Sequence, residues 1–279
     1  MAKILDGKLV AQKIKDEIKE YVANCSNEIS LTIVQVGDNP ASNTYVKHKC
    51  KACEEVGIVS EVNKLPEDID EGILKTEIAF ENALSHGLML QLPLPNGLNA
   101  HELLDCIETE VDADCLTTKA LGEFYASNNP HLAPCTAQGI IDILDHYNIP
   151  IEGKHAVVVG RSNIVGKPVA HLLTCRNATV TICHSKTPNL SEYTKQADIL
   201  VVAIGKPKYI TADMVKDGAI VVDVGINRDE NGKLCGDVDF NSVEPKASWI
   251  TPVPGGCGPM TIAELLLNTI KLYKTQQND

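Results

Sequence analysis

Apolar, β-branched segments alternate with amphipathic stretches along most of the chain. Near-continuous apolar runs are typical of parallel strands buried on both faces, and the intervening stretches are long enough for helices. The alternation therefore predicts an α/β fold with parallel sheets. Amphipathic helices are expected at 44–56 and 165–173. The expected strands lie at 31–37, 88–95, 156–160, 178–183, 198–205 and 219–226.

The same pattern indicates how the chain divides into domains. Its 279 residues favour roughly two domains, and the strand–helix rhythm is most regular in the second half, as in a doubly wound nucleotide-binding domain. The best boundary is the polar, turn-rich stretch 126–139. We expect a first domain over 1–135 and a second over 136–256. The closing segment 257–279, helical from about Thr261, is expected to complete the first domain.

Composition and charge restrict the class of protein. The chain is 44% hydrophobic and 22% charged, as is ordinary for a soluble globular protein. It contains no apolar run of membrane-spanning length, and its start lacks the apolar core of a signal peptide, so we expect a cytoplasmic protein with no membrane partner. The formal net charge of −12 argues against a nucleic-acid partner. Any anionic ligand must be held by local positive groups.

The ten cysteines do not indicate a disulfide framework or a metal site. They are scattered along a chain without an export signal, and we expect them to be reduced. The only CxxC pair, Cys50 and Cys53, lies in a helix-like segment with no second close pair to complete a zinc site. We therefore expect no metal and interpret most of the cysteines as small apolar residues of the core.

The segment 155–173 has the pattern of a dinucleotide-binding loop. An apolar strand ends at Gly160, a short polar loop follows, and a helix begins near Gly166 and Pro168. The free N–H groups at such a helix start attract anions. Compared with the usual GxGxxG pattern, Ser162 replaces the second glycine and the third comes one residue late. A purely structural strand–turn–helix remains the alternative.

The end of the next strand favours NADP over NAD. An NAD site usually has an acidic residue there to bind the ribose 2′-hydroxyl, but residues 183–187 contain no carboxylate. Arg161, in the preceding loop, and the hydroxyl of Ser185 suit a 2′-phosphate instead. The alternative is that residues 184–187 form an ordinary solvated strand end.

Several polar residues of the first half are candidates for chemistry. Tyr45 and Lys49 are four residues apart and share one face of a helix, although Lys49 could simply be a surface lysine. Gln91 is a polar amide in an apolar strand and needs a hydrogen-bond partner, such as a lysine or a ligand's amide edge. Asp112 and Asp114 are acids beside apolar residues, for which a turn or helix cap is an equal alternative.

Stretches distributed over the whole chain together resemble the bifunctional methylenetetrahydrofolate dehydrogenase/methenyltetrahydrofolate cyclohydrolase family. The resemblance extends from the first residues to the last helix, and several of the matching motifs are longer than ten residues. The matching stretches are 36–58, 90–95, 134–139, 157–173, 181–190, 197–207, 221–227, 236–240 and 250–269.

The resemblance implies a folate-binding catalytic domain and a Rossmann-like NADP-binding domain with a cleft between them. It implies hydride transfer from 5,10-methylenetetrahydrofolate to NADP⁺, followed by hydrolysis of the methenyl cation to 10-formyltetrahydrofolate. Such an enzyme belongs to one-carbon metabolism and purine biosynthesis, with tetrahydrofolate derivatives as substrates. The resemblance also implies a homodimer formed through the NADP domains.

Site residues follow from the same resemblance, motif by motif. It implies that Lys49 is the central catalytic residue, Tyr45 packs on the aminobenzoyl ring, Gln91 tunes Lys49 and Asp114 binds the amino edge of the pterin. A neutral Lys49 amine would suit a cationic product better than an ammonium, and could deprotonate the attacking water. The implied cofactor contacts are Gly160, Arg161, Ser162, Ser185 and Ile226.

Three departures from the family pattern stand near these residues. Cys115 replaces the glycine after Asp114, which strains or moves the loop if that position needs a positive φ. Ala137 replaces a proline and loosens a turn, and Cys257 replaces a valine, a change we expect to be silent.

Three other functions are alternatives to this one. A dehydrogenase with weak or absent cyclohydrolase activity would follow from a disturbed Cys115 loop. A hydroxy-acid dehydrogenase of the shikimate type is disfavoured by the motifs at 90–95 and 252–261. A catalytically silent dinucleotide-binding module would be expected to lose Lys49 or Gln91, and both are present.

Overall fold

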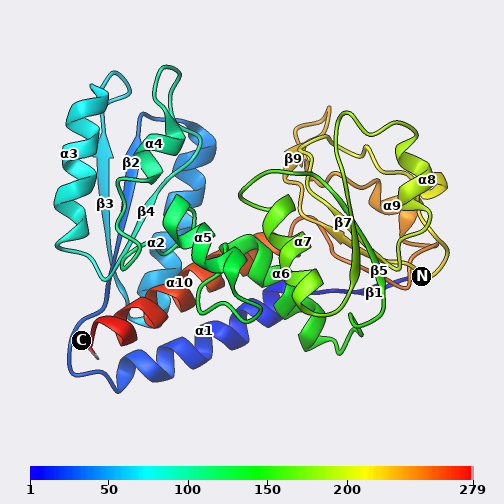
Figure 1. The fold of residues 1–279 in the computed structure, drawn as a ribbon, viewed down its shortest axis with the longest axis horizontal. Coiled ribbons are helices and arrows are strands. Elements are labelled where there is room, and N and C mark those ends of the chain that lie inside the picture. Colours follow the sequence, from blue (N-terminus) through cyan, green and yellow to red (C-terminus); the bar gives the residue numbers. More distant parts are fainter. Residues whose placement is uncertain (278–279) are drawn as a thin grey trace. The chain divides into compact units, whose positions relative to one another are not determined.

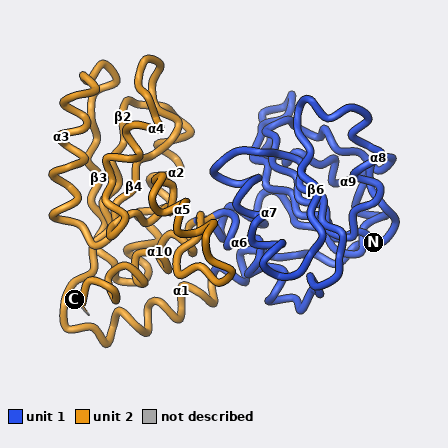
Figure 2. The backbone as a smooth tube through the Cα atoms, viewed as in Figure 1, with its two compact units in different colours: residues 1–11, 136–261 blue, residues 12–135, 262–279 orange. Residues whose placement is uncertain are grey.

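The computed structural model describes residues 1–277. The chain forms two compact units, which we call unit 1 and unit 2 (Figure 2). Unit 1 comprises residues 1–11 and 136–261, and unit 2 comprises residues 12–135 and the chain from 262 onward. Each is built on a parallel sheet, which confirms the predicted α/β class.

Unit 2 contains a three-stranded parallel sheet in the order β3-β2-β4 (Figure 1). Each crossover between its strands is a helix, as parallel pairing requires. The strands are β2 (Ser30–Val36), β3 (Val59–Leu65) and β4 (Gly87–Leu90), and the helices are α2 (Pro40–Val56), α3 (Glu71–Asn82), α4 (Ala100–Leu104) and α5 (Thr118–Ala126).

Helix α2, which carries two of the candidate site residues, is well defined at both ends. The side chain of Asn39 accepts hydrogen bonds from the backbone N–H groups of Ala41 and Ser42, and the proline at position 40 suits a first helical turn. The helix ends at Gly57, whose φ of 84° is the left-handed cap that favours glycine.

The last helix, α10 (Cys257–Gln276), completes the core of unit 2. Its residues Leu265 and Leu266 belong to the same buried cluster as Leu31 and Ile33 of β2. Ile18, in the later part of α1 (Gly7–Ala23), joins this cluster. The expected closing helix is present, and it begins one turn earlier than the predicted start near Thr261.

Unit 1 contains a six-stranded parallel sheet in the order β1-β11-β8-β7-β5-β6. Four neighbouring strands, which end at one edge of this sheet, are the predicted apolar runs 156–160, 178–183, 198–205 and 219–226. The strands are β1 (Lys3–Ile4), β5 (His155–Val159), β6 (Thr179–Cys183), β7 (Ile199–Val202), β8 (Ile220–Asp223) and β11 (Trp249–Ile250). A hairpin of β9 (Asn227–Arg228) and β10 (Leu234–Cys235), a 3₁₀ turn (Ala212–Met214), and helices α6 (Cys135–His146), α7 (Gly166–Cys175), α8 (Leu190–Thr194) and α9 (Phe240–Val243) complete it.

The structure differs from the predicted pattern at two places. Residues 1–11 cluster with unit 1, because Lys3–Ile4 pairs with Trp249–Ile250 at the edge of the six-stranded sheet. The expected strand 88–95 ends at Leu90, and the prolines beyond it have no N–H to donate to a ladder.

All ten cysteines are free thiols, and six of them are buried. Within residues 1–277, no group of three or more His, Cys, Asp or Glu side chains is arranged to hold a metal ion. In the same part of the chain, no helix combines the length and apolarity needed to cross a membrane.

Candidate active site

Lys49 is a buried residue, not a surface lysine. It lies in the middle of α2 with only 7% of its surface exposed. Its Nζ donates to Gln91 Oε1 at 3.0 Å and contacts Met89 Sδ, a weak acceptor, at 3.1 Å. Both acceptors are uncharged. The predicted hydrogen bond between Lys49 and Gln91 is therefore present.

Gln91 directly follows the last residue of β4, and this position is fixed by hydrogen bonds. Its backbone N–H donates to Val34 O at 2.8 Å, which extends the pairing with β2 by one residue beyond the strand. Its side-chain Nε2 donates to Leu92 O at 2.6 Å, so the amide is oriented with Oε1 toward Lys49. Met89, two residues earlier, was missed by the sequence interpretation because a methionine in an apolar strand is indistinguishable from ordinary core.

Tyr45 lies one turn before Lys49 on α2 and is partly buried. Burial raises the pKa of its phenol above the usual value, so the ring remains neutral over the physiological range. A neutral aromatic ring of this kind presents a flat apolar surface beside the lysine.

The loop with Asp112 and Asp114 lies beside β4. Leu88 and Asp112 form an isolated parallel bridge, and residues 113–114 lie in a turn directly after it. Asp114, which is partly exposed, lies in this turn, two residues beyond the bridge to β4.

Asp112 stabilises a turn, which was one of the two interpretations of this acid. It is 1% exposed, and its Oδ2 accepts from the backbone N–H groups of Leu116 at 2.9 Å and Thr117 at 2.8 Å. Burial, the largest effect, raises the pKa of Asp112 to about 6, although these hydrogen bonds oppose the rise.

The residues on either side of Asp114 are fixed. Cys115 has a φ of 56° and is 1% exposed, so this position does require the left-handed conformation that favours glycine. The carbonyl oxygen of Ala113 accepts from Asn268 Nδ2 at 3.0 Å and from Cys135 Sγ at 3.4 Å. Sequence reasoning missed Asn268, an amide in an apolar helix.

Electrostatics connect Asp114 with Lys49. Burial strongly raises the pKa of the Cys135 thiol, the nearby Asp114 carboxylate raises it further, and Lys49 opposes the rise. Met89, Ala113 and Cys135 belong to one buried cluster, so the contact of Lys49 and the residue before Asp114 lie in the same core of unit 2.

In unit 1, two glycines shape the loop after β5. Gly160 has a φ of 137°, and a Cβ there would overlap the carbonyl oxygen of Ala203. A Cβ at Gly166, the first residue of α7, would overlap the carbonyl group of Gly160. A close strand–helix approach of this kind is what a dinucleotide-binding loop requires.

The remaining cofactor candidates flank this loop. Ser162 Oγ accepts from the N–H groups of Val165 at 3.1 Å and Gly166 at 3.4 Å, a capping role that explains a serine in place of glycine. Arg161 is exposed and forms no ion pair with the residues that the structure describes. Ser185 is exposed after β6, and Ile226 is 46% exposed after β8.

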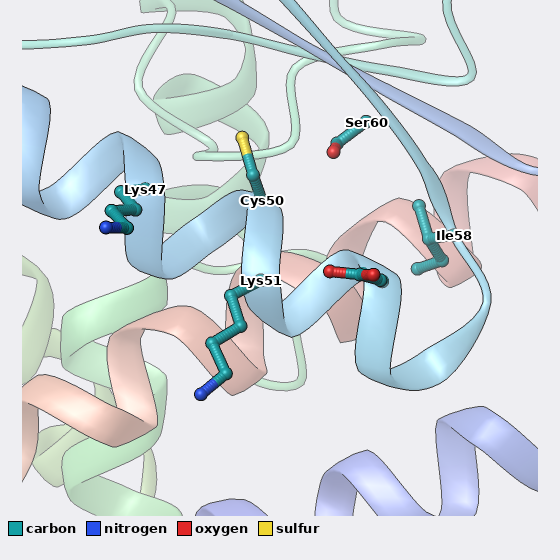
Figure 3. Close-up of a pocket in the computed structure, with 6 residues that line it drawn as sticks. Lys47, Cys50, Lys51, Ile58 and Ser60 are labelled. Atoms are coloured by element: carbon teal, nitrogen blue, oxygen red, sulfur yellow. The ribbon is translucent and has the colours of Figure 1, made fainter.

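An open pocket on the other side of α2 does not include any predicted site residue (Figure 3). Its helical members follow the spacing of a single helix face, whereas Lys49 lies on the opposite face toward β4. The lining residues are Lys47, Cys50, Lys51, Glu54, Ile58 and Ser60.

The parallel sheet of unit 1 and its glycine-lined loop define a dinucleotide-binding unit. Unit 2 of the same chain contains a buried, hydrogen-bonded lysine. The chain belongs to the tetrahydrofolate dehydrogenase/cyclohydrolase family. Residues 5–114 match the family's catalytic domain, and residues 134–277 match its NAD(P)-binding domain.

Individual relatives agree with this assignment. The chain is 50% identical to the bifunctional protein FolD of Agathobacter rectalis, over 98% of this chain and 100% of that one. It is similar to the crystal structure of the bifunctional methylenetetrahydrofolate dehydrogenase/cyclohydrolase FolD from Campylobacter jejuni, with 47% identity, a TM-score of 0.94 and coverage of 99% and 100%.

A third relative was solved with a cofactor. The Trypanosoma brucei enzyme, complexed with NADP and an inhibitor, is 36% identical with a TM-score of 0.95, over 100% of this chain and 99% of that one. The predicted family, its two activities and its nicotinamide cofactor are thus confirmed. The shikimate-type alternative and the silent module are excluded.

Proposed function

We propose that this enzyme oxidises 5,10-methylenetetrahydrofolate to 5,10-methenyltetrahydrofolate with NADP⁺ and then hydrolyses the product to 10-formyltetrahydrofolate. The observation that carries the proposal is the buried hydrogen bond from Lys49 to Gln91 at the end of β4, in the unit that matches the family's catalytic domain. We assign the folate chemistry to unit 2 and cofactor binding to unit 1.

The folate side of the reaction is a positioning task. The partly exposed Asp114 carboxylate accepts hydrogen bonds from the amino edge of the pterin, and Tyr45 packs against the aminobenzoyl ring. Together these contacts hold the one-carbon bridge close to the lysine. Holding the reacting atoms in place supplies much of the rate in such a step.

In the hydrolytic step, Lys49 is the general base. A water molecule attacks the carbon between N5 and N10, and Lys49 Nζ takes one of its protons as the C–O bond forms. The bond from carbon to N5 then breaks, its electron pair stays on N5 with a proton, and the formyl group remains on N10. Gln91 Oε1 accepts an N–H of Lys49 and so orients the amine.

The cofactor side belongs to the loops after β5, β6 and β8. Bound NADP⁺ supplies the acceptor for the hydride. The glycine-lined loop admits the diphosphate against the start of α7, and Arg161 with Ser185 binds the 2′-phosphate. Ile226 offers an exposed apolar surface to the ring. The exposed guanidinium of Arg161, which has no ion-pair partner within residues 1–277, supports this choice of NADP over NAD.

The assembly and cellular role are proposed on the family resemblance. We infer a cytoplasmic homodimer, formed through the NADP-binding units, that supplies one-carbon groups for purine biosynthesis. Sedimentation equilibrium of the purified chain tests the dimer, since a monomer at micromolar concentration would contradict it.

A single assay tests the catalytic assignment. Methenyltetrahydrofolate is supplied without NADP⁺ and its decay is followed by absorbance, and NADP⁺ reduction is followed separately with the methylene substrate. Lys49→Met should slow the decay by about 10²–10⁴-fold, because the general base is lost, while some NADP⁺ reduction remains.

Lys47→Met provides the matched control, because Lys47 lies on the opposite, exposed face of the same helix (Figure 3). It should leave both rates unchanged. A Lys49→Met enzyme that hydrolyses at the wild-type rate would refute the base assignment. Wild-type enzyme that reduces NADP⁺ but does not accelerate the decay would establish the alternative, a dehydrogenase with weak or absent cyclohydrolase activity.

A further inference from the structure

Asp237, which the proposed chemistry does not use, has a fully buried carboxylate that accepts four hydrogen bonds. Its Oδ2 accepts from the N–H groups of Ile204 at 2.7 Å and Gly205 at 3.0 Å. Its Oδ1 accepts from Lys206 N–H at 2.7 Å and Asn227 Nδ2 at 2.8 Å. Three successive N–H groups of the loop after β7 thus form an anion nest that this carboxylate fills.

Asp223, the last residue of β8, is a second buried carboxylate and is joined to the first. Its Oδ1 accepts from the N–H groups of Gly225 at 3.0 Å and Asp237 at 2.9 Å. Its Oδ2 accepts from Val238 N–H at 2.9 Å, and its own N–H donates to Thr251 Oγ1 at 2.7 Å. We call Asp223 and Asp237 the carboxylate clasp.

Two glycines make room for the clasp. A Cβ at Gly225 would overlap the carboxyl group of Asp237, and a Cβ at Gly236 would overlap that of Asp223. Neither glycine has a φ in the left-handed region. Glycine is therefore required at both positions only because a side chain would not fit there. The local sequence is therefore adapted to the two carboxylates.

The clasp lies where a dinucleotide crosses the sheet. Strands β6, β5, β7 and β8 are adjacent and parallel, so their following loops share one edge. From β5 the chain crosses to β6 on one side of it, and the next strand, β7, pairs with β5 on its other side. The strand order therefore reverses at β5, and ligands of such sheets bind at this switch point. The proposed site for the 2′-phosphate of the adenosine half is beside Ser185, after β6. Since the cofactor crosses the sheet from there, its nicotinamide half lies toward the loops after β7 and β8.

We propose that Asp223 and Asp237 are positioning residues for the nicotinamide half of NADP, acting through the loops 203–207 and 224–227. The clasp ties both loops to each other and to the segment 236–238 before the cofactor binds. This inference rests on the proposed function of unit 1. It assigns no contact between either carboxylate and the cofactor.

The proposal is tested by binding and by the two half-reactions together. Asp237→Asn replaces an acceptor oxygen by a donor within the nest and should raise the dissociation constant for NADP⁺, measured by calorimetry, about tenfold or more. Hydrolysis of supplied methenyltetrahydrofolate without NADP⁺ should stay within about twofold of wild type, since that chemistry belongs to unit 2. Asn227→Ala removes one hydrogen bond to Oδ1 and should raise the constant by a smaller factor.

Asp239→Asn is the matched control, because Asp239 is partly exposed and its side chain caps no helix. It should bind NADP⁺ like wild type. Unchanged NADP⁺ binding in folded Asp237→Asn and Asn227→Ala would overturn the proposal, as would an equal loss of binding and hydrolysis. If Asp237→Asn does not fold, Asn227→Ala alone decides. Failure of the wild type to bind NADP⁺ would instead refute the proposed function.

Discussion

Asp223 should make the stability of unit 1 depend on pH. Burial, reinforced by the neighbouring charge of Asp237, raises the pKa of Asp223 from 3.8 to about 7 against the opposing effect of its hydrogen bonds. Because each pH unit between the folded and unfolded pKa values is worth about 1.4 kcal/mol, this difference corresponds to about 4 kcal/mol.

The sign follows from which state binds the proton more tightly. The folded pKa is the higher one, so this contribution to the free energy of unfolding is complete below 3.8 and is lost as the pH rises through 7. Between about pH 5 and pH 8.5 the loss is ~3 kcal/mol. Asp223→Asn cannot titrate and carries only a constant penalty for its lost hydrogen bond. Its free energy of unfolding relative to wild type should therefore rise by ~3 kcal/mol over this interval.

The chain offers a suitable probe for this measurement. Trp249 is its only tryptophan and lies in unit 1, so urea unfolding followed by tryptophan fluorescence reports on the unit that contains Asp223. Asp217→Asn is the control, since the side chain of Asp217 is 90% exposed, and its difference from wild type should not change with pH. A constant difference between Asp223→Asn and wild type at both pH values would refute the reasoning.

Three further substitutions test the remaining assignments. Arg161→Ala should raise the KM for NADP⁺ about tenfold or more and the KM for NAD⁺ far less, because only NADP⁺ carries the 2′-phosphate. Equal effects on both cofactors would contradict this role. Asp114→Asn should raise the folate KM and leave calorimetric NADP⁺ binding unchanged. Cys115→Val, which places a β-branched residue at a φ of 56°, should lower the free energy of unfolding by about 1–3 kcal/mol in urea titrations; unchanged stability would show that the loop relaxes.

Much of the fold could be predicted because strands buried on both faces produce continuous apolar runs, as at 199–202 and 220–223. The strand Lys3–Ile4 could not, because it is exposed and only two residues long, and its partner Trp249 is distant in sequence. Its place in the sheet depends on a contact that no local pattern reveals.

The site residues also divide into those that the sequence could predict and those that it could not. Gln91 was predictable, because a polar amide among apolar residues needs a partner. Asn268 had the same signal in the last helix, and Asp223 and Asp237 had it as acids within apolar segments. Most of their partners, however, are backbone groups, which side-chain patterns do not identify.

The return of α10 to unit 2 has a consequence for how the protein is made. Leu265 and Leu266 share a buried cluster with Leu31 and Ile33, so the core that begins with the first strands of unit 2 is closed by residues near the end of the chain. During synthesis, the apolar surface of unit 2 stays uncovered while residues 136–261 of unit 1 are translated. The core of the catalytic unit can therefore close only after Leu265 and Leu266 have been synthesised, and the apolar surface of its first strands is exposed for longest.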